Sequence, residues 1–153
     1  GSSQKKIKSP ESIAVDKKGR IYIVDWESHE VFIFSARGEY LSSFGKLGEN
    51  SPGSTGKSAK FVFPVSIALS QDLDGVQFGN EKIYRNPILF IGDKYGIHMV
   101  TSTGIYWDTF DLPGVVDATG YSIAVKGYGV NMQLFLADKR TGKITRFSAF
   151  LRK

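Results

Sequence analysis

The chain of 153 residues contains no cysteine and only two histidines. Without cysteine it can form no disulfide, thiolate nucleophile or cysteine-rich zinc site, and the sequence does not report its redox compartment or its localisation. Every apolar run falls short of the roughly 20 residues that a membrane-spanning helix requires. The sequence therefore predicts no membrane-spanning segment.

Sequence signatures of catalysis are also missing. The segment from Gly120 to Ile123 lacks the second glycine of a GxSxG nucleophile motif. His29 and His98 show neither the HxH nor the HExxH spacing expected of zinc enzymes. The Gly-Lys-Ser at residues 56–58 follows its preceding glycine too closely for a phosphate loop. We therefore expect no catalytic residue, no metal site and no cofactor, which points away from an enzyme.

The composition is that of a globular domain rich in strands. Hydrophobic residues make up 41 % of the chain, charged residues 23 % and aromatic residues 13 %, and there are 17 glycines. This mixture suits short strands joined by tight turns. The formal net charge is +5, but basic residues near both ends inflate it, so it indicates a polyanionic partner only weakly. Residues 1–3 read as the remnant of an expression tag, which leaves residues 4–153 as a single domain.

Three segments of the chain share a Ser-Ile-Ala core, and their starts lie 54 and 56 residues apart. The segments start at Ser12, Ser66 and Ser122. An apolar run ending in aspartate follows each of them, at Asp25, Asp93 and Asp138. A second apolar run comes next in every case. A fixed period of this size is the mark of a repeat architecture.

The first repeat has the pattern of four short antiparallel strands. We expect these strands at residues 12–15, 20–25, 31–35 and 39–44. Gly19 occupies a turn position that requires a positive φ. Four strands in about 40 residues, with no helical periodicity, are typical of one propeller blade.

The second and third repeats depart from this pattern. The second carries an insertion within residues 71–87, which we expect to be a loop whose role the sequence does not define. The third stops before its fourth strand, and residues 4–8 could supply that strand. The sequence predicts an all-β fold of three four-stranded antiparallel propeller blades, at about residues 9–48, 62–112 and 118–153.

The connection at residues 45–60 is rich in glycine, serine and lysine. Sixteen such residues form a long segment by the standards of ordinary loops. It could be a binding loop or a solvated linker, and we favour the linker.

The first repeat closely resembles the NHL repeat. The residues that carry the resemblance are Pro10, residues 13–16, Gly19, residues 21–25, His29, Val31, Phe34, Gly38 and residues 43–45. The other two repeats match only in the Ser-Ile-Ala core and the two strands after it, so they are degenerate copies. The resemblance implies a β-propeller, usually six-bladed, of which three blades are half.

Three blades cannot close such a ring by themselves. Either the chain is cut from a longer protein, or two copies join head to tail into a six-bladed ring. We favour the homodimer, because the missing strand of the third blade and the spare segment at residues 4–8 complement each other.

The turns after the three aspartates should share one face with the connections between blades. The candidate binding residues on this face are Trp26, His29, Lys94, Tyr95, Lys139 and Arg140. Aromatic rings beside cations can stack on ring ligands and pair with phosphate or carboxylate, although exposed turn residues of these types are also common. The aspartates could form a metal ring or cap their turns by accepting backbone N–H bonds, and we favour the caps.

The expected function is a non-catalytic protein-interaction or scaffold module, completed by self-association and presenting one face to a protein or peptide partner. A second possibility is single-stranded RNA binding, which some NHL propellers perform through a basic, aromatic face. A third is a fragment of a metal-dependent propeller enzyme of the lactone hydrolase or amidating lyase type. The sequence does not identify the partner.

Overall fold

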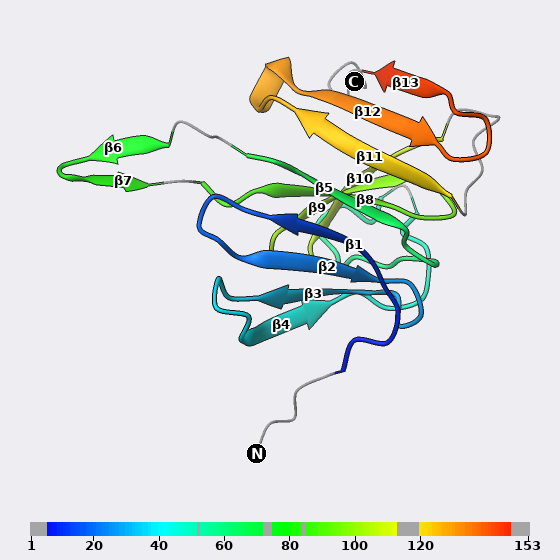
Figure 1. The fold of residues 1–153 in the computed structure, drawn as a ribbon, viewed down its shortest axis with the longest axis horizontal. Coiled ribbons are helices and arrows are strands. Elements are labelled where there is room, and N and C mark those ends of the chain that lie inside the picture. Colours follow the sequence, from blue (N-terminus) through cyan, green and yellow to red (C-terminus); the bar gives the residue numbers. More distant parts are fainter. Residues whose placement is uncertain (1–5, 52, 72–74, 84, 113–119, 148–153) are drawn as a thin grey trace.

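The structure, a computed structural model, describes residues 6–51, 53–71, 75–83, 85–112 and 120–147. These residues contain thirteen strands and one 3₁₀ helix, η1 (Gly129–Asn131), as Figure 1 shows. The strands are β1 (Pro10–Val15), β2 (Ile21–Asp25), β3 (Glu30–Phe34), β4 (Tyr40–Phe44), β5 (Ser66–Ser70), β6 (Val76–Phe78), β7 (Glu81–Ile83), β8 (Ile88–Gly92), β9 (Ile97–Thr101), β10 (Tyr106–Phe110), β11 (Tyr121–Lys126), β12 (Gln133–Asp138) and β13 (Ile144–Phe147). In this part of the chain no helix is long and apolar enough to cross a membrane.

The strands form three antiparallel sheets and a separate hairpin. Sheet 1 has the order β1-β2-β3-β4, sheet 2 the order β5-β8-β9-β10 and sheet 3 the order β11-β12-β13. The all-β class and the two four-stranded antiparallel sheets agree with the expectation from sequence. Residues 148–153, which follow β13, lie outside the described part of the chain.

Alternating side chains explain how sheet 1 forms. Tyr22 and Val24 of β2 are fully buried, whereas Ile21 and Ile23, which alternate with them along the strand, are only half-buried on the opposite face. The turn from β1 to β2 closes at Gly19, whose φ of 85° confirms the predicted positive value.

Two hydrophobic clusters hold the three sheets together. The cluster between sheets 1 and 2 includes Tyr22, Val31, Leu89 and Ile91. The cluster between sheets 2 and 3 includes Phe90, Ile97, Leu134 and Leu136. Sheet 2 is therefore covered on both faces, which explains why the sequence of β8 is almost continuously apolar.

The first strands of the three sheets lie next to one another. In Figure 1, β5 lies between β1 and β11 and contacts both of them. Sheet 1 extends from β1 toward the bottom of the view, and sheet 3 extends from β11 toward the top. Sheets that radiate from adjacent inner strands form a propeller-like arrangement.

The connection between sheets 1 and 2, for which the sequence favoured a solvated linker, is held against sheet 2. Ala59 and Phe61 are buried in the cluster between the two sheets. The N–H of Gly56 donates to the Tyr106 carbonyl at 2.8 Å, and the Tyr106 N–H donates to the Lys57 carbonyl at 2.7 Å. Most side chains of residues 45–60 are exposed, as expected of a linker, but these hydrogen bonds and the buried Ala59 hold the segment against sheet 2.

The insertion at residues 71–87 contains more order than the expected loop. Strands β6 and β7 pair as a hairpin that projects away from the sheets (Figure 1). Its described side chains are exposed, including Phe78, whose exposed fraction is 73 %. The hairpin forms from local pairing, and its described side chains belong to neither cluster.

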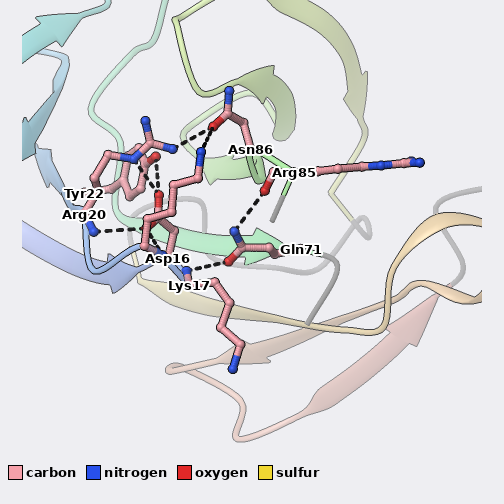
Figure 2. A network of polar contacts seen from close by, with 8 residues as sticks. Asp16, Lys17, Arg20, Tyr22, Gln71, Arg85 and Asn86 are labelled. Atoms are coloured by element: carbon pink, nitrogen blue, oxygen red, sulfur yellow. Dashed lines mark hydrogen bonds and ion pairs between the residues drawn. The ribbon is translucent and has the colours of Figure 1, made fainter. Parts of the chain in front are cut away.

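A polar network ties the base of this insertion to sheet 1, as Figure 2 shows. Asp16 is buried and accepts hydrogen bonds from Tyr22 Oη at 2.9 Å and Arg20 Nε at 2.8 Å. Burial, reinforced by the hydrogen bond to Asp16, raises the pKa of Tyr22. Arg20 then donates to the Asn86 side chain at 2.9 Å, and the Lys17 N–H donates to the Gln71 side chain at 2.7 Å.

The described part of the spare segment proposed to complete a blade forms no strand in this single chain. Residues 6–8 are irregular, and residues 4 and 5 lie outside the described part. The backbone N–H groups of Lys8 and Ser9 donate instead to the carboxylate of Asp25. These residues are thereby held at the end of sheet 1 where β1 begins.

Candidate interaction face

Strands β2, β8 and β12 each end in an aspartate that organises the following turn. Asp25 is fully buried and accepts four backbone N–H groups. The donors are Lys8, Ser9, Glu27 and Ser28, at 2.6 to 3.2 Å. Burial by itself would raise the pKa of Asp25, but the four donors outweigh this effect and lower it below its usual value.

The other two aspartates have equivalent roles. Asp93 accepts the N–H groups of Val62 and Tyr95, both at 2.8 Å. Asp138 accepts the N–H of Arg140 at 3.0 Å. These bonds confirm the capping role predicted from the sequence. Within the described residues, no three histidine or acidic side chains lie close enough together to hold a metal ion.

The same three turns are bonded to the segments that lead into the inner strands. The residue after each aspartate donates its N–H to one of these segments. The bonds run from Trp26 to the Ser9 carbonyl at 2.9 Å, from Lys94 to the Val62 carbonyl at 3.3 Å and from Lys139 to the Gly120 carbonyl at 2.9 Å. All three turns therefore lie at the same end of their sheets, as the sequence led us to expect.

Phe63, which sequence reasoning missed, packs between two of the candidate residues. Its ring centroid lies 4.4 Å from that of Trp26 and 4.6 Å from that of His29. Its N–H donates to His29 Nδ1 at 2.9 Å, which leaves the imidazole proton on Nε2. We call Trp26, His29 and Phe63 the aromatic cluster. The apolar run of residues 61–65, with Phe63 directly before Pro64, was the signal that could have found it.

The aromatic cluster combines exposure with an uncommon backbone. His29 and Phe63 have φ values of 59° and 51°, in the left-handed region that residues with a side chain rarely adopt. The exposed fractions of Trp26 and Phe63 are 37 % and 39 %. Apolar surface is thus presented to solvent on a backbone that the neighbouring contacts must hold in place.

Lys94 and Tyr95 lie next to this cluster. Val62, the neighbour of Phe63 in the chain, accepts the Lys94 N–H, so the turn of sheet 2 adjoins the cluster. Tyr95 is 45 % exposed, and the ammonium group of Lys94 lies 5.7 Å from its ring centroid. This distance is within the range of a cation–π interaction.

Lys139 and Arg140 occupy the equivalent turn of sheet 3, and both are exposed. Sheet 3 contacts the Tyr95 turn through Tyr121, whose hydroxyl donates to the Asp93 carbonyl at 2.7 Å. Burial raises the pKa of Tyr121, so its hydroxyl remains a donor. The structure thus brings four of the six candidate residues together and places Lys139 and Arg140 one sheet further along.

Comparison with known proteins gives a family assignment for the first repeat. Residues 8–34 match the NHL repeat. This match confirms the resemblance seen in the sequence, for the segment that contains β1, β2 and β3. No match was found among proteins of curated function.

Among solved structures, the chain is similar to selenomethionine-substituted virginiamycin B lyase from Staphylococcus aureus. The two are 13 % identical, and the match covers 94 % of this chain and 71 % of that one, with a TM-score of 0.25. A likeness at that TM-score carries no argument about fold or function.

In the NHL repeat, His29 has the structural position that the resemblance implied. It is buried, its Nδ1 accepts a backbone N–H, and its ring supports Phe63. Its contribution to the candidate face is therefore to hold the Phe63 ring, which packs on Trp26, rather than to contact a partner itself.

The other histidine lies outside the NHL match, in a buried polar chain within sheet 2. His98 Nε2 lies 2.8 Å from Asp93 Oδ1, and its Nδ1 lies 2.8 Å from Thr109 Oγ1. A hydroxyl, an imidazole and a carboxylate in this order can activate a nucleophile. Here the hydroxyl also bonds to Tyr106 Oη at 2.7 Å, and this series of hydrogen bonds links strands β9 and β10 to the Asp93 turn. Its evident role is structural.

Proposed function

We propose that the three sheets are consecutive blades of an NHL-type β-propeller, and that this propeller is a non-catalytic module for binding a protein or peptide. The NHL match in sheet 1, the four-stranded antiparallel sheets and the adjacent inner strands support the propeller. The partner binds at the aromatic cluster and the neighbouring Tyr95.

The observation that carries this proposal is the exposed Trp26–Phe63 pair. Tryptophan and other aromatic side chains supply much of the binding energy at protein interfaces, because they bury a large area at a small cost in conformational entropy. A left-handed backbone at His29 and Phe63 carries a cost of order 1–3 kcal/mol at each residue, and such positions cluster at ligand sites. Both features occur here at one place.

A pocket beside Tyr95 favours a peptide over a polyanion. Its volume is about 310 Å³, and its lining includes Tyr95, Tyr106 and the acidic residues Glu49, Asp108 and Asp111. Three carboxylates with two tyrosines suit the ammonium or guanidinium group of a lysine or arginine side chain. We expect preferred peptides to combine an apolar residue, which packs on Trp26, with a basic residue in this pocket.

The two tryptophans of the chain allow a matched test. Peptides selected from a displayed random library on the unmodified protein should bind the Trp26→Ala variant at least about tenfold more weakly, because an interface anchor is lost. The Trp107→Ala variant should bind as the unmodified protein does, since Trp107 is exposed and belongs neither to the aromatic cluster nor to the lining of the pocket. Equal effects of the two substitutions, or no effect of Trp26→Ala, would contradict the proposed site.

Single-stranded RNA is the second candidate partner, because Lys94 lies over the Tyr95 ring and further cations occupy the turn of sheet 3. An RNA complex should weaken steeply with salt, since phosphate contacts release counterions. Absence of binding to a mixed-sequence oligoribonucleotide at low salt would eliminate this candidate.

A further inference from the structure

The two junctions between sheets repeat the same hydrogen bond. Ser12 Oγ accepts the N–H of Ile67 at 3.1 Å, and Ser66 Oγ accepts the N–H of Ile123 at 3.0 Å. In both junctions the serine of one inner strand binds the isoleucine of the next inner strand. Ser122 is the serine of the last inner strand, and Ile13 is the isoleucine of the first.

Apolar side chains at the junctions repeat in the same way. On each inner strand, the serine and alanine face the following sheet, and the isoleucine and the residue two positions later face the preceding sheet. Ile67 and Ile123 are accordingly buried at the junctions. Within the described residues no sheet covers Ile13 and Val15, and their exposed fractions are 62 % and 58 %.

One outer face of the molecule therefore carries the same kinds of apolar side chain that are buried at the junctions between sheets. It consists of Ile13, Val15, Ile21 and Ile23, which pair across β1 and β2, and we call it the Ile13 face. The residues that correspond to Ile21 and Ile23 are Leu89 and Ile91 in sheet 2 and Leu134 and Leu136 in sheet 3, all fully buried. An antiparallel sheet facing solvent normally carries polar side chains, so this face is built to be covered.

The opposite outer face, on sheet 3, has the matching side chains. It contains Ser122, Ala124, Phe135 and Ile144, and by strand register also Ala137 and the exposed Arg146. We call it the Ser122 face. Ile144 corresponds by strand register to Val31 and Ile97, which are fully buried at the two internal junctions. Ile144 itself is 76 % exposed.

We propose that the Ile13 face of one chain packs against the Ser122 face of a second copy, with Ser122 Oγ accepting the Ile13 N–H of that copy. At each internal junction, the equivalent of the Ile13 face packs against the equivalent of the Ser122 face. The two outer faces therefore complement each other, and the occupant that fits best is another molecule of this chain. A two-fold dimer forms two identical junctions and leaves neither face exposed, which closes a ring of six sheets.

This inference gives the self-association expected from the sequence a specific surface and does not depend on the ligand of the aromatic cluster. Loss of the ring would leave the Trp26 site of a single chain intact, and loss of peptide binding would leave the ring intact. The two proposals can therefore fail separately.

Light scattering at micromolar concentration tests the ring directly. We expect twice the 16.9 kDa mass of one chain. Ile13→Lys should raise the dissociation constant by at least about tenfold for each junction, because a charged side chain replaces buried apolar area. Leu41→Lys is the control, since Leu41 is exposed on β4 of the same sheet but lies outside the Ile13 face, and it should leave the mass unchanged. A single-chain mass for the unmodified protein would overturn the proposal.

The absence of natural cysteine allows a test of the head-to-tail arrangement. Ile13→Cys and Ser122→Cys chains should form a covalent dimer with a short thiol-specific cross-linker only when the two are mixed. As a positive control, a chain that carries Ser12→Cys and Ile67→Cys should cross-link internally. Cross-linking of Ile13→Cys chains with one another would show a head-to-head contact and would overturn the proposal, as would a mixture that fails to cross-link.

Discussion

Single aspartates determine how the turns of the candidate face are built. Asp25 accepts four backbone N–H groups, and two of them come from the segment that precedes β1. One carboxylate thus holds the β2–β3 turn and the start of sheet 1 together. Because the charged form accepts these bonds, the pKa of Asp25 is lowered, and the same side chain couples the order of this face to pH.

Replacement of Asp25 by asparagine should destabilise the protein at neutral pH. An NH₂ group then replaces one oxygen and faces a backbone donor, at a cost of about 1–3 kcal/mol in the free energy of unfolding. Denaturant unfolding followed by circular dichroism measures the change. Glu27→Gln is the matched control, because Glu27 is exposed and should change stability by less than about 0.5 kcal/mol.

The pH dependence gives the same prediction a second readout. A lowered pKa in the folded state stabilises the protein at every pH above the unfolded pKa of about 4, and this contribution is lost as the pH falls through the folded pKa. The stability difference between the unmodified protein and Asp25→Asn should therefore shrink below pH of about 4. A difference that stays constant down to pH of about 2 would contradict the role assigned to the carboxylate.

Two segments between the strands of the sheets differ in what they bury. The connection between β4 and β5 inserts Phe61 fully into the cluster between sheets 1 and 2. The β6–β7 hairpin instead exposes its aromatic residue, Phe78. Both segments look polar and irregular in the sequence, so only their packing separates a structural element from a projection.

The two phenylalanines provide a matched pair of substitutions at this scale. Phe61→Ala should lower the free energy of unfolding by about 3–5 kcal/mol, because it opens a cavity between two sheets. Phe78→Ala should change it by less than about 0.5 kcal/mol, since an exposed side chain loses few contacts. Thermal and denaturant unfolding of both variants measures the difference, and similar effects would show that the connection is not part of the core.

Across the whole molecule, the sheets are joined by the serines of their inner strands as well as by apolar packing. Ser66 is almost fully buried and accepts the Ile123 N–H across the junction of sheets 2 and 3. A buried N–H group without an acceptor is costly, so this bond helps to set how the two sheets meet.

Ser66→Ala should therefore cost about 1–3 kcal/mol of stability, because the Ile123 N–H loses its acceptor. Ser122→Ala, the equivalent change on the outer face of sheet 3, should leave the stability of the monomer unchanged. Unfolding measured at a concentration where only single chains are present compares the two variants. An equal loss in both would mean that the serine stabilises its own strand and not the junction.

Much of the fold could be read from local patterns. The Ser-Ile-Ala starts, the Asp-ending strands and Gly19 identified the inner strands, their partners and the first turn, because strand alternation and turn geometry depend on neighbouring residues. The capping role of Asp25 was also predictable, since two of its four donors are the residues that follow Trp26.

Contacts between distant segments could not be read in this way. Phe63 follows His29 by 34 residues and joins the candidate face only because the connection folds back and places it against Trp26 and His29. The burial of Phe61 and the polar contact between Asp93 and His98 depend on the same kind of tertiary packing.

By itself, the sequence determined that this protein is made of three repeated antiparallel sheets, the first of them built on an NHL repeat. Tertiary structure decided which of the repeated residues are buried and which are exposed. Ile13 and Ile123 have the same local sequence and the same strand alternation, yet only Ile123 is covered by a neighbouring sheet. Local propensity cannot distinguish these two isoleucines, because burial depends on which sheet packs beside each strand.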